Sequence, residues 1–186
     1  MRWSTSARRA LGDSSRGPYL GLLVDGAITG ISELDSSPTG ASGGARSGLG
    51  FEFTWDRRDR AHAARTGTLL RTSVLVADGL FGSTYDYGRV SLDARAYRRI
   101  WEDHTLAGRL VADVGWGDTP FYDLVTLGGP ELLRGTYQGR YRGRSRLAGQ
   151  LEYRSPQIYD VHFAAFAAAG TVADTPALVD FADTRI

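Results

Sequence analysis

The sequence predicts an all-β fold, an antiparallel transmembrane β-barrel segment of about seven strands with one loop inserted into its lumen. Three observations favour this fold class. Apolar and polar residues alternate with period two in successive runs, as they do in strands. Several runs span roughly 9 to 13 residues, whereas strands of soluble proteins typically have about five or six. A loop late in the chain also carries more apolar bulk than a solvated turn needs.

Composition narrows the class of protein. A chain of 186 residues forms one domain or part of one, and 42% hydrophobic and 23% charged residues exclude a disordered chain. The net charge of +1 gives no case for nucleic-acid binding. The absence of cysteine excludes disulfides and thiolate metal sites. Residues 1–6 lack the apolar region of a signal peptide, and no run of about 18 apolar residues marks a transmembrane helix.

The N-terminal part, residues 1–47, is predicted to hold one weak strand and a loop. Residues 16–24 place Leu20, Leu22 and Val24 on one face of that strand. Residues 36–47 are rich in glycine, serine and proline, and therefore form a loop or linker. The remaining residues, 48–186, are predicted to be the barrel portion.

The first strands of the barrel portion alternate clearly. In residues 48–56 four large apolar side chains share one face: Leu49, Phe51, Phe53 and Trp55. Residues 68–76 repeat this pattern, with Leu70 and Val74 opposite Arg71. The clearest strand covers residues 85–97, where the apolar face consists of Val90, Leu92, Ala94 and Ala96, and the charged face of Arg89, Ser91, Asp93 and Arg95.

Three more strands complete the count. Residues 104–116 set Leu110 against Arg109 and Asp113, and residues 146–154 set Leu151 against Glu152. A last run, 161–172, has Val161, Phe163 and Ala165 on one side and Phe166 on the other. Aromatic residues near the strand ends favour the interfacial girdles of a membrane barrel over a soluble antiparallel sheet: Tyr85, Tyr87, Tyr97, Trp101, Trp116, Phe121 and Tyr122.

The loop that organises the chain covers residues 127–137 and reads LGGPELLRGTY. Its two glycines and its proline exclude a regular helix or a central strand. Leu132, Leu133 and Tyr137 surround its single arginine, Arg134, with apolar bulk. Such a loop suits a position folded back into an interior rather than a solvated turn.

Five short motifs then carry a resemblance to a known family. They are FTWDRRD at 53–59, TGT at 66–68, LGG with LRGTY at 127–137, EYRSP at 152–156 and FAAAG at 166–170. This series resembles the bacterial surface antigen D15 family, the barrel of the Omp85 superfamily, from about residue 48 to residue 172. Members of that superfamily include BamA and TamA, and the arginine-glycine loop is the specific part of the match.

The resemblance implies a barrel of the bacterial outer membrane with about sixteen strands, more than this chain supplies. We therefore expect the barrel portion to be truncated before the closing strands, which it needs as partners because lipid does not tolerate open sheet edges. The POTRA repeats that precede such barrels are a second missing partner. Members of the family assemble outer-membrane proteins or export polypeptides without nucleotide, metal or other cofactor, so the resemblance implies no enzyme.

The resemblance also assigns the candidate site. The loop motif, Leu133, Arg134, Gly135, Thr136 and Tyr137, is expected in the lumen, with Arg134 forming a bidentate pair with Glu152 on the inner wall. The family's second acid belongs to a Phe-x-Asp-x-Gly pattern, where this sequence has Ala168. Asp113 or Asp93 would then have to take its place.

Other signals are weaker. A G-x-S-x-G match at residues 40–44 lies in the predicted loop, without the strand and helix of a hydrolase elbow, so no catalytic residue is assigned. His62, His104 and His162 share no metal-ligand spacing. The basic run Arg140, Arg142, Arg144 and Arg146 is expected to line the lumen or to bind lipopolysaccharide. Two alternatives stay open, namely a soluble or surface β-sheet binding module and a barrel that anchors a fused catalytic domain.

Overall fold

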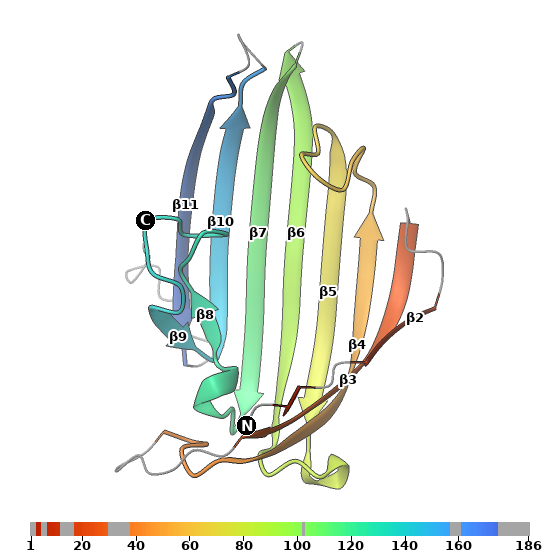
Figure 1. Ribbon diagram of the computed structural model, residues 1–186, viewed down its shortest axis with the longest axis vertical. Coiled ribbons are helices and arrows are strands. Elements are labelled where there is room, and N and C mark those ends of the chain that lie inside the picture. The colour runs from red at the N-terminus through yellow and green to blue at the C-terminus, as the bar shows by residue number, and fades with distance from the viewer. Residues whose placement is uncertain are drawn as a thin grey trace.

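The structure is a computed structural model that describes residues 3–4, 7–11, 17–29, 38–101, 103–156 and 161–174. Most of it is one antiparallel sheet, whose long strands lie side by side in Figure 1. The strand order is β1-β3-β4-β5-β6-β7-β10-β11, and β2 also pairs with β3. Across the described residues this sheet stays open instead of closing on itself. The all-β class and the partial barrel are therefore confirmed.

The strands match the predicted runs and extend most of them. Their bounds are β1 Trp3–Ser4, β2 Ala7–Leu11, β3 Gly17–Thr29, β4 Gly44–Asp56, β5 Gly67–Ala77, β6 Tyr87–Trp101, β7 His104–Gly117, β8 Val125–Leu127, β9 Tyr141–Gly143, β10 Ser145–Arg154 and β11 Ala164–Ala173. Two short 3-10 helices are η1 Gly79–Phe81 and η2 Phe121–Asp123. The alternation does not predict β1, β2 or the hairpin of β8 and β9, because strands of two to five residues show too little of a period.

The predicted loop over residues 36–47 is wrong at its end. Residues 36 and 37 lie outside the described part of the chain, and 38–43 form turns. Gly44 already pairs with Thr29, and the ladder continues without interruption to Asp56 opposite Gly17. Glycine and serine weaken a strand only slightly, and thirteen cross-strand pairs with β3 override that preference.

The sheet has one apolar and one polar face. Alternate residues of β4 to β7 and of β10 leave large apolar side chains exposed on what we call the outer face: Leu49, Phe51, Trp55, Leu70, Val74, Val76, Val90, Leu110, Val114, Trp116 and Leu151. The other face, the inner face, carries Glu52, Asp93, Asp113 and Glu152, all partly or fully buried. An exposed apolar band opposite a polar face is typical of a membrane barrel wall and favours it over a soluble sheet.

Four of the predicted girdle aromatics lie elsewhere: Tyr87 and Tyr97 belong to the inner face, and Phe121 and Tyr122 lie in η2, in the connection that follows β7. Tyr87 is buried on the inner face, where its hydroxyl donates a hydrogen bond to Asp123. Tyr97 pairs in register with Ala107, whose other cross-strand partner is Glu152, so it also belongs to the inner face. Side chains alternate between the two faces along a strand. Tyr87 and Tyr97 occupy odd-numbered positions of β6, whereas the outward Val90 and Ala96 occupy even-numbered positions. No helix in the described ranges is long and apolar enough to span a membrane.

Candidate functional site: a loop held against the inner face

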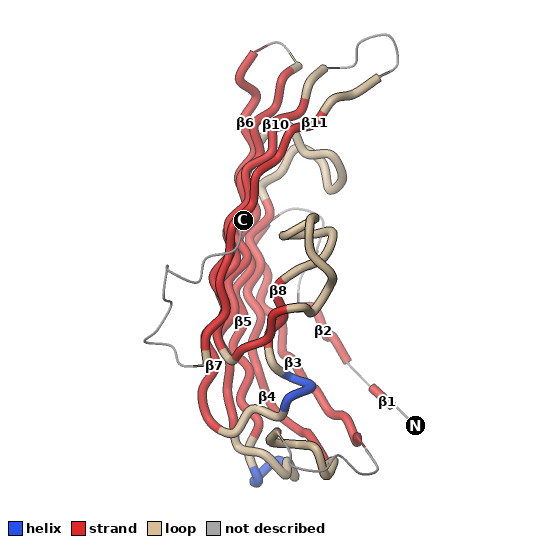
Figure 2. The backbone as a smooth tube through the Cα atoms, turned by 90° about the vertical axis from the view of Figure 1, so that its left-hand side faces the viewer, coloured by secondary structure: helices blue, strands red, loops and turns tan. Residues whose placement is uncertain are grey.

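Residues 118–144, which we call the inner loop, connect β7 to β10 and lie on one side of the sheet (Figure 2). The strands β8 and β9 pair within it as an antiparallel hairpin. Gly128 and Gly129 begin its tip with φ of +118° and +100°, a region that favours glycine. A Cβ on Gly128 would lie 2.3 Å from the carbonyl oxygen of Tyr137, so the tip has room for glycine only.

Apolar side chains attach the inner loop to the wall. Leu127, Leu132 and Leu133 are buried in one cluster with Val111 of β7 and Ala148 of β10. The wall is suited to this contact because Val111 and Ala148 are cross-strand partners, and small or apolar residues interrupt the charged rows there. Burying a leucine side chain contributes about 1.5–3 kcal/mol. The loop therefore has an apolar attachment that does not depend on its arginine.

Arg134 extends from the same turn toward β10 and β11. Its Nη2 donates a hydrogen bond of 2.8 Å to Oε2 of Glu152, and its Nε donates one of 3.2 Å to the carbonyl oxygen of Pro130. Its Cζ also lies 4.3 Å from the ring centroid of Phe166, a distance suited to a cation–π contact. The structure thus brings Arg134 and Glu152 together, through one nitrogen rather than the bidentate pair expected.

Glu152 is the centre of a small hydrogen-bond network. Its Oε1 accepts a bond of 2.6 Å from Nε of Arg154, while Oε2 accepts bonds from Arg134 and from the side-chain amide of Gln150. Arg154 in turn reaches the carbonyl oxygen of Ala64 in the β4–β5 connection. One carboxylate therefore serves two guanidinium groups, and Arg134 contacts it through Nη2 alone because its Nε donates to Pro130 instead.

The remaining residues of the loop motif have separate positions. The backbone N–H and the hydroxyl of Thr136 both donate to the carbonyl oxygen of Leu133, and its own carbonyl accepts from Gly129. Nothing lies within 4 Å of a Cβ built on Gly135, so packing does not require glycine there. Tyr137 is 84% exposed, whereas Leu132 and Leu133 are buried, so the apolar bulk predicted around Arg134 is buried only in part.

Ala168 stands where the resemblance predicts a second acid. It pairs in register with Gln150, which pairs in turn with Arg109. Neither proposed substitute takes its place beside Arg134. Asp113 binds Arg146 at 2.6 Å, and Asp93 binds Arg95 at 2.7 Å and Arg109 at 2.9 Å. Each of these carboxylates lies on another row of the wall and is used there.

A second contact region, at the root of the inner loop, was not predicted from the sequence. Asp123 at the end of η2 pairs with Arg46 of β4 and accepts a 2.6 Å hydrogen bond from the hydroxyl of Tyr87. The guanidinium of Arg89 donates to the backbone oxygen of Asp123 at 3.0 Å. Arg46 falls in a stretch that reads as a loop, so only the pairing of β3 with β4 reveals its place on the wall.

Comparisons with known proteins agree with this architecture. The Omp85 superfamily domain matches residues 23–184. Among solved structures, BamA from Haemophilus ducreyi lacking POTRA domains 1–3 has the same fold, with a TM-score of 0.64 and 18% sequence identity. The match covers 83% of this chain and 38% of the BamA chain, so this chain spans well under half of that length. No match is found among curated proteins. By its matching domain, this chain belongs to the Omp85 superfamily and is an Omp85-type β-barrel portion.

Proposed function

We propose that this chain forms part of the wall of a bacterial outer-membrane barrel that assembles or inserts outer-membrane proteins, or translocates polypeptides. The observation that carries the proposal is the inner loop held against a charged inner face by Arg134, Glu152 and Phe166. Membership of the Omp85 superfamily supports it, and so does the exposed apolar outer face, which suits contact with lipid.

In this proposal the two faces of the sheet have different roles. The outer face contacts the hydrocarbon of the bilayer, while the inner face and the inner loop shape the lumen. Client polypeptides of such a barrel are bound as extended strands, for which sheet edges and polar lumen groups provide hydrogen-bond partners. The partners required are the remaining strands of the barrel and the POTRA repeats. No step in this role needs a cofactor or a chemical reaction.

Lipopolysaccharide is a further proposed partner of the inner loop. Arg140 and Arg142 are exposed near its end, and neither guanidinium is part of an ion pair with a described acidic residue. Arg146 of the same basic run is used within the wall, where it pairs with Asp113 and donates to Thr126. Binding of lipopolysaccharide should therefore weaken with salt and depend on Arg140 and Arg142 but not on Arg146.

The test uses the complete protein with Arg134→Ala, and Arg144→Ala as the matched control for loss of an arginine from the same loop, since it leaves the trypsin sites at Arg140 and Arg142 in place. We expect Arg134→Ala to expose the loop to trypsin at Arg140 and Arg142 and to reduce assembly or export of clients. Unchanged trypsin protection together with unchanged client handling would remove the basis of the proposal. Heat-modifiable gel migration in detergent separates a barrel from a soluble β-sheet module, and a catalytic activity that persists in Arg134→Ala would point to an anchor for a fused enzyme.

A further inference from the structure

The wall beside the inner loop has more guanidinium groups than carboxylates to pair with them. A cavity of about 320 Å³ lies between loop and wall, and four arginines line it: Arg95, Arg109, Arg134 and Arg154. Three carboxylates are near, those of Asp93, Glu131 and Glu152. The described groups around this cavity therefore carry an excess of one positive charge.

The local excess of positive charge is greater than this count of groups suggests, because the three carboxylates are unequally placed. Asp93 is shared by Arg95 and Arg109, and Glu152 by Arg134 and Arg154. The third, Glu131, has 81% of its side chain exposed, and its Oε2 lies 3.4 Å from Nη1 of Arg109. Because this contact is long and screened by solvent, Glu131 neutralises the charge of Arg109 only weakly. Each guanidinium has five N–H donors, more than the carboxylate oxygens that these arginines share can accept in full, so the arginines that line the cavity have capacity for one more acceptor.

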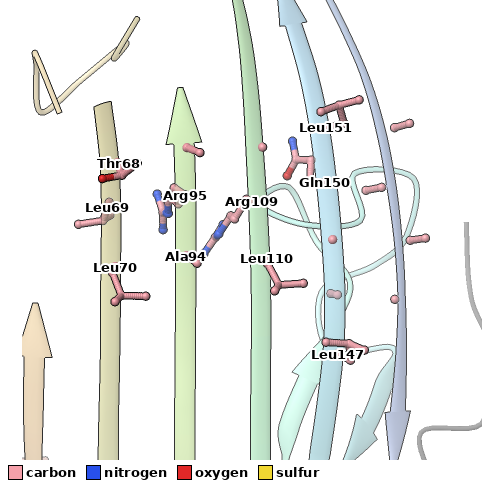
Figure 3. Close-up of a pocket in the computed structure, with 18 of the residues that line it drawn as sticks. Thr68, Leu69, Leu70, Ala94, Arg95, Arg109, Leu110, Leu147, Gln150 and Leu151 are labelled. Carbon is pink, nitrogen blue, oxygen red and sulfur yellow. The ribbon is translucent and has the colours of Figure 1, made fainter. Parts of the chain in front are cut away.

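Ala168 of β11 borders this cavity, because it is the cross-strand partner of Gln150, which lines it. Arg95, Arg109, Gln150 and Ala168 form one cross-strand row of the inner face, from β6 to β11. Figure 3 shows the first three: Arg109 extends from β7 toward β6, which carries Arg95, and Gln150 lies on the other side of β7. Only donor-rich side chains and one methyl group occupy this row. A carboxylate at position 168 would lie next to Gln150, with Arg109 one strand further along the same row.

We propose that this cavity binds one carboxylate of a polypeptide in the lumen, an aspartate or glutamate side chain from outside the described residues. A carboxylate matches the excess of one charge, and its two oxygens fit the planar guanidinium fork. A phosphate would bring nearly twice that charge. The inference builds on the proposed function, because the polypeptide would be a client or another segment of the barrel.

The first experiment supplies the carboxylate from within the chain. In the complete protein, Ala168→Asp should raise the melting temperature in detergent by roughly 2–4 °C relative to Ala168→Asn, which has the same shape without the charge. The difference should shrink in the Arg109→Gln background. An aspartate variant that melts at or below the asparagine variant would overturn the proposal.

The second experiment measures the charge and the occupant directly. The chain has no cysteine, so Ala168→Cys gives one reactive thiol, and Ser91→Cys gives a control on the same face in the row of Glu52 and Asp113. An anionic methanethiosulfonate should outpace its cationic analogue at position 168 by roughly tenfold more than at position 91. An aspartate-containing peptide should slow the reaction at 168, whereas its asparagine analogue should not. Equal reagent preference at both positions, or equal protection by inorganic phosphate, would overturn the assignment.

Trypsin cleavage separates this inference from the proposed function. If Arg140 and Arg142 stay protected while Ala168→Asp has no effect, the carboxylate site is wrong and the placement of the loop survives. If trypsin cleaves these sites in the unmodified protein, the loop does not lie in the lumen and both proposals fall.

Discussion

Glu152 on β10 and Phe166 on β11 are direct cross-strand partners, and the guanidinium of Arg134 contacts both of them. The carboxylate attracts its charge from one side, while the ring face lies 4.3 Å from Cζ. A single side chain of the inner loop is thereby fixed against two adjacent strands. Register alone makes this possible, because a shift of one residue in β11 would turn Phe166 to the outer face.

The Arg134–Glu152 pair should show coupling in a double-mutant cycle. Both groups are partly buried, with 38% and 11% of the side chains exposed, so the pair is less screened than a surface pair. We expect Arg134→Ala and Glu152→Gln to couple by about 1 kcal/mol in the free energy of unfolding, measured by urea titration of the complete protein in detergent. Simple additivity of the two losses would mean that the contact does not stabilise the loop.

Glu152→Gln should also cost more stability than Arg134→Ala. Its carboxylate serves Arg154 as well, so the substitution weakens two ion pairs at once. A second cycle, Arg154→Ala with Glu152→Gln, serves as the control, and its coupling should appear without any change in trypsin protection of the inner loop. If Arg154→Ala lowers the trypsin protection of the inner loop as much as Arg134→Ala does, the network around Glu152 holds the loop as a unit rather than through Arg134.

The Phe166 ring should matter only when Arg134 is present. Phe166→Leu keeps the apolar volume nearly constant but removes the ring face, which should cost about 0.5–1 kcal/mol. In an Arg134→Ala background the same substitution should be close to neutral. Phe51→Leu is the matched control, because Phe51 is exposed on the outer face, away from the inner-face arginines. An equal loss in both backgrounds would assign the effect of Phe166 to packing.

Alternation along the chain predicts the long strands and their faces well, because each period-two run has one buried or inward row. The positions of Gln150 and Glu152 on one face of β10 follow from it directly, whereas the side on which Phe166 meets them depends on the register of β11. Parity also corrects the aromatic interpretation, since Tyr87 and Tyr97 sit in inward rows despite lying near strand ends. Alternation therefore predicts which face of the sheet an aromatic side chain occupies better than it predicts the role of that side chain.

The contacts between distant segments are not predictable in this way. Arg46 and Asp123 are separated by 77 residues, and neither carries a local signal that names the other. Tyr137 is exposed at the end of a loop that the sequence identifies from its glycines without giving the path of the chain. Such features depend on how the loop folds back, and that is set by packing rather than by period.

The apolar attachment of the inner loop should outweigh its ion pair. Leu133 is 3% exposed and packs with Leu127 and Val111, so Leu133→Ala leaves a cavity and should cost about 2–4 kcal/mol. Trypsin should then cleave at Arg140 faster than in Arg134→Ala. Leu80→Ala, at a leucine that is 91% exposed on η1, should leave both stability and cleavage unchanged. Slower cleavage in Leu133→Ala than in Arg134→Ala would show that the ion pair is the main attachment.

The root of the loop should be held independently through Asp123. Asp123→Asn removes the charge that faces Arg46 and weakens the acceptor of the Tyr87 hydroxyl, both in a buried setting, which should cost about 1–3 kcal/mol. Chymotrypsin should then cleave after Phe121 or Tyr122, while trypsin protection at Arg140 is retained because Arg134 and Leu133 still hold the tip. Asp118→Asn, at an exposed aspartate of the same loop, is the control and should change neither. If Asp123→Asn releases the tip as well, the two attachments are one cooperative unit, and the independence expected from their separate positions on β4, β6, β10 and β11 is wrong.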